Sequence, residues 1–152
     1  MRNAFLLALA VVACSTKDAP VTDSAAGTAA PATPAQLTAA DITGSWTGMT
    51  MPQGSDSVTN RWTTIHDTDS TGRIISENSP DTIMYSVVFD ADSMIATSKP
   101  YTMTASPKAP VVFRSVGRLK DGKLVGTNTI TLAAKPDSVV ARSHWEATKK
   151  QP

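Results

Sequence analysis

The feature that most constrains the fold is a period-two alternation of apolar and polar residues between positions 41 and 150. Successive side chains of a β-strand point to opposite faces, so this alternation predicts strands with one buried face. No apolar stripe of helical period continues for ten residues in this part of the chain. The expected strands cover residues 43–51, 58–66, 73–78, 83–89, 93–98, 101–106, 111–119, 123–132 and 138–148.

Turn signals separate these strands at intervals of about ten residues. The pair Asp121-Gly122 is typical of a type I′ hairpin, and further turns are expected at 67–72, 90–92 and 135–137. Eight or nine successive antiparallel strands joined by short turns favour an up-and-down barrel, because closure removes the exposed strand edges. The alternative is a two-sheet β-sandwich. The sequence therefore predicts an all-β domain at 41–150.

Two other segments precede this domain. Residues 1–13 have the layout of a signal peptide, in which Arg2 is followed by ten uncharged, apolar residues. As a helix, ten residues span about 15 Å, which is half of a bilayer core of about 30 Å. Residues 14–40 are rich in Ala, Pro and Thr and contain few large apolar residues, so we expect a flexible tether.

The tether begins at Cys14, the single cysteine of the chain. The stretch Val11-Val12-Ala13-Cys14 resembles the bacterial lipobox, with Val11 where Leu is commonest. The resemblance implies that Cys14 is the first mature residue and carries acyl chains, which are the expected contact with the membrane. Ser15 resembles a sorting signal for the outer membrane, so we expect a lipid-anchored protein of the bacterial cell envelope that faces the periplasm. The alternatives are an ordinary signal peptide with an incidental cysteine, or a free thiol.

The first expected strand opens with Gly44-Ser45-Trp46, which resembles the G-x-W signature of the lipocalins. The resemblance implies an eight-stranded barrel in which Gly44 permits a tight entry and Trp46 plugs one end. It also implies a basic residue of the final strand packed on Trp46, for which Arg142 and Lys149 are both candidates. The second lipocalin motif, Thr-Asp-Tyr, is absent, and the domain is shorter than is usual in that family.

Residues for catalysis are scarce. His66 and His144 are the only histidines, and we expect both to be solvated on the surface. The chain has no G-x-S-x-G motif, and sequence alone does not bring the two glutamates, Glu77 and Glu146, together. We therefore predict no enzyme activity and no catalytic residue, and a hydrolase is an alternative without support.

A metal or cofactor is not expected either. Asp67-x-Asp69-x-Thr71-Gly72 resembles the first half of an EF-hand loop. The twelfth position would be Asn78 instead of the Glu that closes a calcium site, so an ordinary polar turn is the simpler interpretation. Charges of both signs are scattered and the net charge is +1, which does not indicate a nucleic-acid partner.

Apolar residues are the remaining candidates for a binding site. Met and aromatic side chains suit an adaptable apolar pocket, so a small apolar ligand is one hypothesis. The simpler interpretation is that these side chains fill a small barrel. The protein would then be an envelope interaction or structural protein without an internal ligand, whose protein partner is unknown. The candidate ligand-binding residues are Trp62, Tyr85, Met94, Met103, Phe113 and Trp145.

Overall fold

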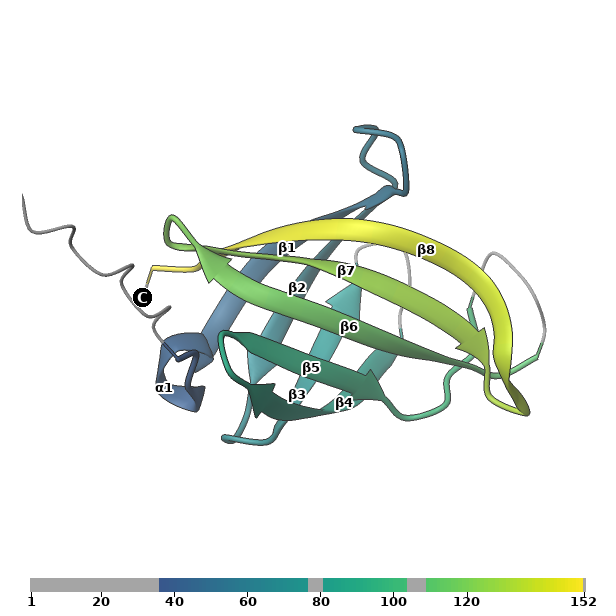
Figure 1. Cartoon of the computed structure of the whole chain (residues 1–152), viewed down its shortest axis with the longest axis horizontal. Helices are drawn as coiled ribbons and strands as arrows, with labels where there is room; N and C mark the ends of the chain where they lie inside the picture. The colour runs from purple at the N-terminus through teal and green to yellow at the C-terminus, as the bar shows by residue number, and fades with distance from the viewer. Residues whose placement is uncertain (1–35, 77–80, 104–108, 152) are drawn as a thin grey trace, which may run out of the picture. The chain divides into compact units, whose positions relative to one another are not determined.

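Eight antiparallel strands close into a barrel in which each strand pairs with the next and the last returns to the first (Figure 1). The structure, a computed structural model, describes residues 36–76, 81–103 and 109–151. The prediction of a lipocalin-like up-and-down barrel is confirmed, and the sandwich alternative is wrong. The strands are β1 (Gly44–Pro52), β2 (Asn60–His66), β3 (Thr71–Ser76), β4 (Thr82–Asp90), β5 (Ser93–Ser98), β6 (Val111–Lys120), β7 (Lys123–Leu132) and β8 (Lys135–Lys149).

The strand expected at 101–106 does not appear in its described part, 101–103. Tyr101 forms only an isolated bridge with Val111. Prolines lie on both sides of this segment, at Pro100 and Pro110, and proline has no N–H for a ladder hydrogen bond. The remainder of the expected strand lies outside the described residues.

The turn expected at 135–137 was also wrong, because Lys135 already begins β8 and the turn lies at 133–134. The β7–β8 register shifts between Ile130 and Leu132, so Pro136 is accommodated in an irregular part of the ladder. Val139 is 44% exposed in this irregular region. Leu119 is 42% exposed, because β6 continues at that point toward its hairpin turn.

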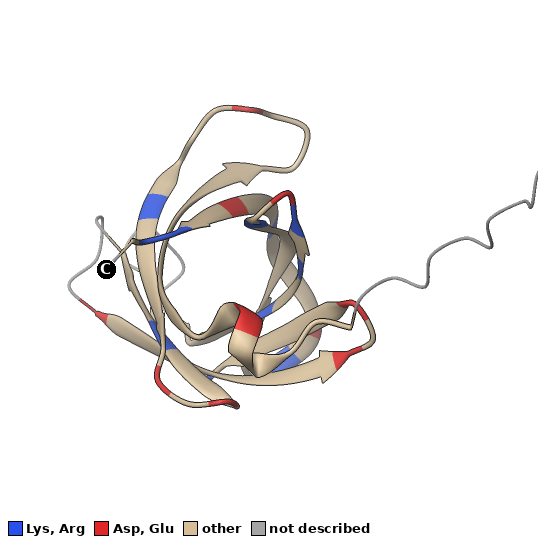
Figure 2. Ribbon diagram, turned by 90° about the vertical axis from the view of Figure 1, so that its left-hand side faces the viewer, with Lys and Arg blue, Asp and Glu red and all other residues tan. Residues whose placement is uncertain are grey.

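A single helical turn, α1 (Ala39–Ile42), lies across one end of the barrel (Figure 2). Ile42 is buried, and Trp46 beneath it is 1% exposed. The indole Nε1 of Trp46 donates a hydrogen bond to the Ile42 carbonyl at 2.7 Å. The Lys149 ammonium lies 5.5 Å from the centroid of the Trp46 ring, so Lys149, and not Arg142, is the basic residue on this tryptophan.

The sharp entry from α1 into β1 depends on Gly44. Its φ is +109°, in a region that side chains with a Cβ rarely adopt. Because β1 starts at the end covered by α1, the connections β1–β2, β3–β4, β5–β6 and β7–β8 all lie at the opposite end. The barrel thus has one end closed by α1 and Trp46 and one end bordered by loops. No helix among the described residues is long and apolar enough to cross a bilayer.

Candidate functional site: the barrel cavity

The barrel encloses a cavity of about 490 Å³ that is lined by side chains from all eight strands. The interior is therefore not filled, and the interpretation of a solid barrel was wrong. Most lining groups are apolar. The charged side chains of the lining, Asp81 and Arg142, are both exposed and lie toward the loop-bordered end. All six candidate residues from the sequence contribute to the wall: Trp62, Tyr85, Met94, Met103, Phe113 and Trp145.

Glycines explain why the interior is hollow although it contains large rings. A Cβ placed on Gly117 or on Gly126 would come within 2.7 Å and 2.6 Å of the Trp145 ring. Gly48 stands in the same relation to the ring of Trp62. Each indole therefore lies against the wall of the barrel in space that a side chain would otherwise occupy. The sequence contained a signal for this hollow interior, because β6 and β7 each carry a glycine at an inward position, next to apolar inward residues.

His66 lies inside the barrel and is 6% exposed, so the expectation of a solvated surface histidine was wrong. On β2 the inward positions are Trp62, Thr64 and His66, while the apolar Ile65 points outward. Two of these three inward residues are polar, whereas the residue between them, Ile65, is apolar and faces outward. The alternation of β2 therefore did not indicate that His66 faces the interior. The second histidine, His144, is half-buried and does not line the cavity.

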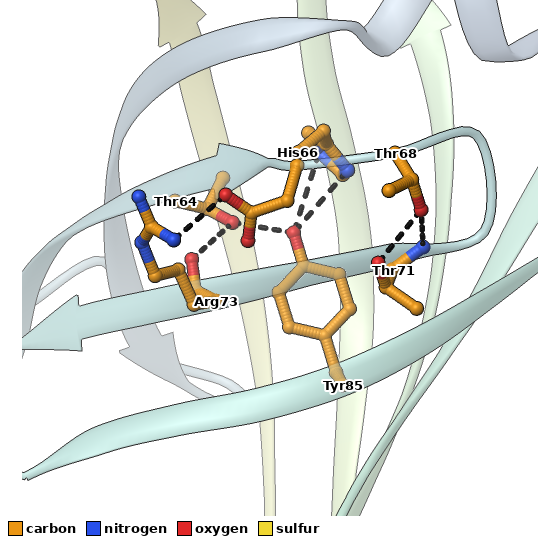
Figure 3. A network of polar contacts seen from close by, with 7 residues as sticks. Thr64, His66, Thr68, Thr71, Arg73 and Tyr85 are labelled. Carbon is orange, nitrogen blue, oxygen red and sulfur yellow. Dashed lines mark hydrogen bonds and ion pairs between the residues drawn. The ribbon is translucent and has the colours of Figure 1, made fainter.

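A directed chain of hydrogen bonds connects His66 to the barrel wall (Figure 3). The Thr64 hydroxyl donates to the Arg73 carbonyl at 3.0 Å, so its one proton is committed. The Tyr85 hydroxyl, 2.5 Å from Thr64 Oγ1, must then be the donor of that pair. Its oxygen is left to accept from the ring of His66, whose Nδ1 lies 3.3 Å away. The O–H groups of Thr64 and Tyr85 are therefore both used within the protein.

This end of the cavity is uncharged at neutral pH. Burial lowers the pKa of His66 to about 4, with Asp67 opposing this effect and Lys149 adding to it. Burial also raises the pKa of Tyr85 to about 12, against the opposing effect of its hydrogen bond with Thr64. A ligand in the deep part of the cavity would meet neutral groups.

The indole N–H groups of the two cavity tryptophans each have a hydrogen-bond partner. Trp145 Nε1 donates to Ser115 Oγ at 2.8 Å, and Trp62 Nε1 donates to Thr50 Oγ1 at 2.9 Å. Ser115 Oγ in turn donates to the Thr127 carbonyl at 3.3 Å. Asn128 Oδ1, which is buried in the cavity wall, accepts no hydrogen bond from the described residues.

The stretch with calcium-loop spacing forms the hairpin turn between β2 and β3. Asp67 forms an ion pair with Arg73 at 2.7 Å. Thr68 Oγ1 accepts hydrogen bonds from the backbone of Ser70 and Thr71, which is the usual role of a threonine in a turn. Within the described ranges, no three His, Cys, Asp or Glu residues gather in a way that could hold a metal ion. Cys14, Glu77 and Asn78 lie outside the described residues.

No protein-family model matches the chain, and no curated protein matches it. The geometry of the cavity is thus the basis for a functional conclusion.

Proposed function

We propose that the protein is a lipid-anchored envelope lipoprotein whose barrel binds a small, mostly apolar molecule in its interior. The observation that carries this proposal is the cavity of about 490 Å³. Sites for small molecules usually measure about 300–1,000 Å³ and combine an apolar wall with a few polar groups. The composition of the wall described above fits that class of site.

The two ends of the barrel differ in a way that suits ligand binding. At one end, Ile42 and Trp46 exclude solvent together with α1. The lining residues Tyr101, Thr102 and Met103 belong to the connection between β5 and β6, at the other end. A ligand would enter between the loops at this end. Met103 is a flexible side chain that adapts to ligands of different shape.

A titration with a neutral lipophilic dye, N-phenyl-1-naphthylamine, tests the proposal. We expect saturable dye binding at micromolar concentration and quenching of the fluorescence of Trp62 and Trp145, which both line the cavity. Ala141→Phe adds a ring to the cavity wall and should weaken dye binding about tenfold or more. The matched control is Val140→Phe, at an exposed neighbouring position, and it should bind dye as the wild type does. Wild-type protein that takes up no dye at this concentration would contradict the proposal.

The membrane anchor is the second part of the proposal. Cys14 in its lipobox-like context would carry the acyl chains, and Ser15 favours the outer membrane, facing the periplasm. Two or three acyl chains, at about 0.8 kcal/mol per buried CH₂, hold a protein stably on a bilayer. Leu37 is buried in the barrel core, and Ala39 and Ala40 belong to α1, so the expected tether would end before Leu37. A flexible tether of residues 15–36 would have a reach of about 23–28 Å. The ligand site would then face the aqueous compartment.

A further inference from the structure

Aromatic side chains are concentrated in the wall of the cavity. Phe, Trp and Tyr make up only 5% of the chain, and they are eight residues in all. Five of these eight line the cavity, namely Trp62, Tyr85, Tyr101, Phe113 and Trp145. The surface that the barrel offers to an occupant is therefore much richer in aromatic rings than the chain as a whole.

These rings form two walls on opposite sides of the lumen. Trp62 on β2 and Trp145 on β8 flank β1, with 5.9 Å between their ring centroids. Tyr85 on β4 and Phe113 on β6 flank β5, with 6.2 Å between their ring centroids. The ring of Tyr101 follows at 6.3 Å from that of Phe113. Because β1 and β5 are four strands apart in a closed barrel of eight, the two aromatic walls face each other.

The ring of Trp62 lies flat against the barrel wall. A Cβ placed on Gly48 would be within 2.7 Å of three consecutive ring atoms of Trp62. An atom that approaches a ring edge in the plane of the ring comes that close to two ring atoms at most, so Gly48 lies under the face of this indole. On the other wall, a Cβ on Gly72 would meet the phenol ring of Tyr85, so this ring also lies close to the backbone. The backbone thus covers one face of the Trp62 ring, and the opposite face borders the cavity.

The polar atoms of three of these rings are used inside the protein. The indole N–H groups of Trp62 and Trp145 are donated to Thr50 and Ser115. The hydroxyl of Tyr85 is used in the hydrogen-bond chain of the closed end. These three rings therefore offer an occupant their carbon faces and edges, which recognise another ring better than they recognise a polar group.

We infer that the ligand is an uncharged molecule with a flat aromatic or conjugated ring system, which inserts between the two aromatic walls. This inference rests on the proposed ligand-binding function and specifies the chemical class that the site takes. Aromatic rings attract one another in offset-stacked and edge-to-face arrangements beyond what the buried area alone contributes. A saturated ring of the same skeleton has no such quadrupole and gains only the apolar contacts.

Two probes of identical skeleton, each in competition with N-phenyl-1-naphthylamine, test the inference. They are biphenyl-4-methanol and its fully saturated analogue, trans-4-cyclohexylcyclohexanemethanol, which are both uncharged and carry the same hydroxymethyl group. The saturated analogue has the larger apolar surface, so transfer out of water by itself favours its binding. We expect the wild type to bind the aromatic probe more tightly instead, by about threefold or more.

Variants that remove one ring from the lining show where this preference arises. Trp62→Leu keeps the wall apolar but removes one aromatic face, so the preference for the aromatic probe should fall to about one or reverse. The matched control is Phe89→Leu, an aromatic residue of β4 outside the cavity lining, which should keep the wild-type preference. If Trp62→Leu does not fold, Phe113→Leu on the opposite wall serves in the same comparison.

The outcomes separate this inference from the proposed function. Equal affinity for the two probes, or tighter binding of the saturated one by the wild type, would overturn the aromatic class while ligand binding stands. An unchanged preference in Trp62→Leu, or in Phe113→Leu where that variant is used, would overturn the role of the aromatic walls. Absence of binding by the dye and by both probes would overturn the inference and the proposed function together.

Discussion

His66 illustrates how one inward position changes the chemistry of a side chain. In water its imidazole would be charged over part of the physiological pH range. Inside the barrel, burial favours the neutral form, and the Tyr85 hydroxyl accepts from the ring. The neighbouring charges act in opposite directions, since Asp67 raises the pKa of His66 and Lys149 lowers it. The result is a neutral residue at the closed end of the cavity.

This shift predicts a stability that depends on pH. The pKa of His66 is about 4 in the folded state and about 6.5 in the unfolded chain, so between these values the unfolded state binds more protons. The free energy of unfolding should therefore fall as the pH drops from 6.5 to 4, by about 2–3 kcal/mol from this residue. His66→Gln should remove most of that slope, as measured by urea unfolding at several pH values. An equally steep fall in the variant would assign the pH dependence to other groups.

At the scale of the element, the pairing of aromatic rings with inward glycines shapes the barrel wall. The ring of Trp145 on β8 lies against Gly126 on β7 and Gly117 on β6. These two glycines are register partners of each other. Its ring packs edge-to-face with Trp62, with 5.9 Å between ring centroids. The two rings thus cover the wall on either side of β1 and leave the lumen open.

Gly126→Ala tests this arrangement. A Cβ at this position would collide with the Val116 carbonyl as well as with the Trp145 ring, and a backbone carbonyl cannot rotate away as a side chain does. We expect a loss of about 1–3 kcal/mol in the free energy of unfolding, which is typical of overpacking. Urea denaturation followed by tryptophan fluorescence measures it. The control Thr97→Ala, at an exposed position of β5, should cost less than about 1 kcal/mol, and an equal cost in both variants would argue against tight packing at Gly126.

At the scale of the whole molecule, lipidation is expected at a residue that the barrel does not contain. The described strands close without a cysteine, and the part of the expected tether that packs on the barrel begins only at Leu37. Cys14→Ala should therefore abolish incorporation of labelled fatty acid and release or strand the protein, while the circular dichroism spectrum of the barrel stays unchanged. Membrane attachment that persists in this variant would contradict lipidation at Cys14.

The barrel topology follows from local features of the sequence. Alternation is a property of neighbouring residues, and a turn such as Asp121-Gly122 pairs strands that are adjacent in the chain. Eight strands joined by seven connections leave two free edges, which β1 and β8 remove by pairing with each other. Local patterns were therefore sufficient to predict an up-and-down barrel and to single out six of the large side chains that line its interior.

Contacts between distant residues had to come from the tertiary structure. The choice of Lys149 over Arg142 beside Trp46, the inward position of His66 and the unpaired acceptor of Asn128 each depend on strands far apart in sequence. The cavity itself depends on how much volume the rings leave after packing against their glycines, which no single strand specifies. Sequence alone determined which residues face inward in most strands. Tertiary structure decided which of these inward-facing side chains contact one another, because their packing depends on how the eight strands close into the barrel.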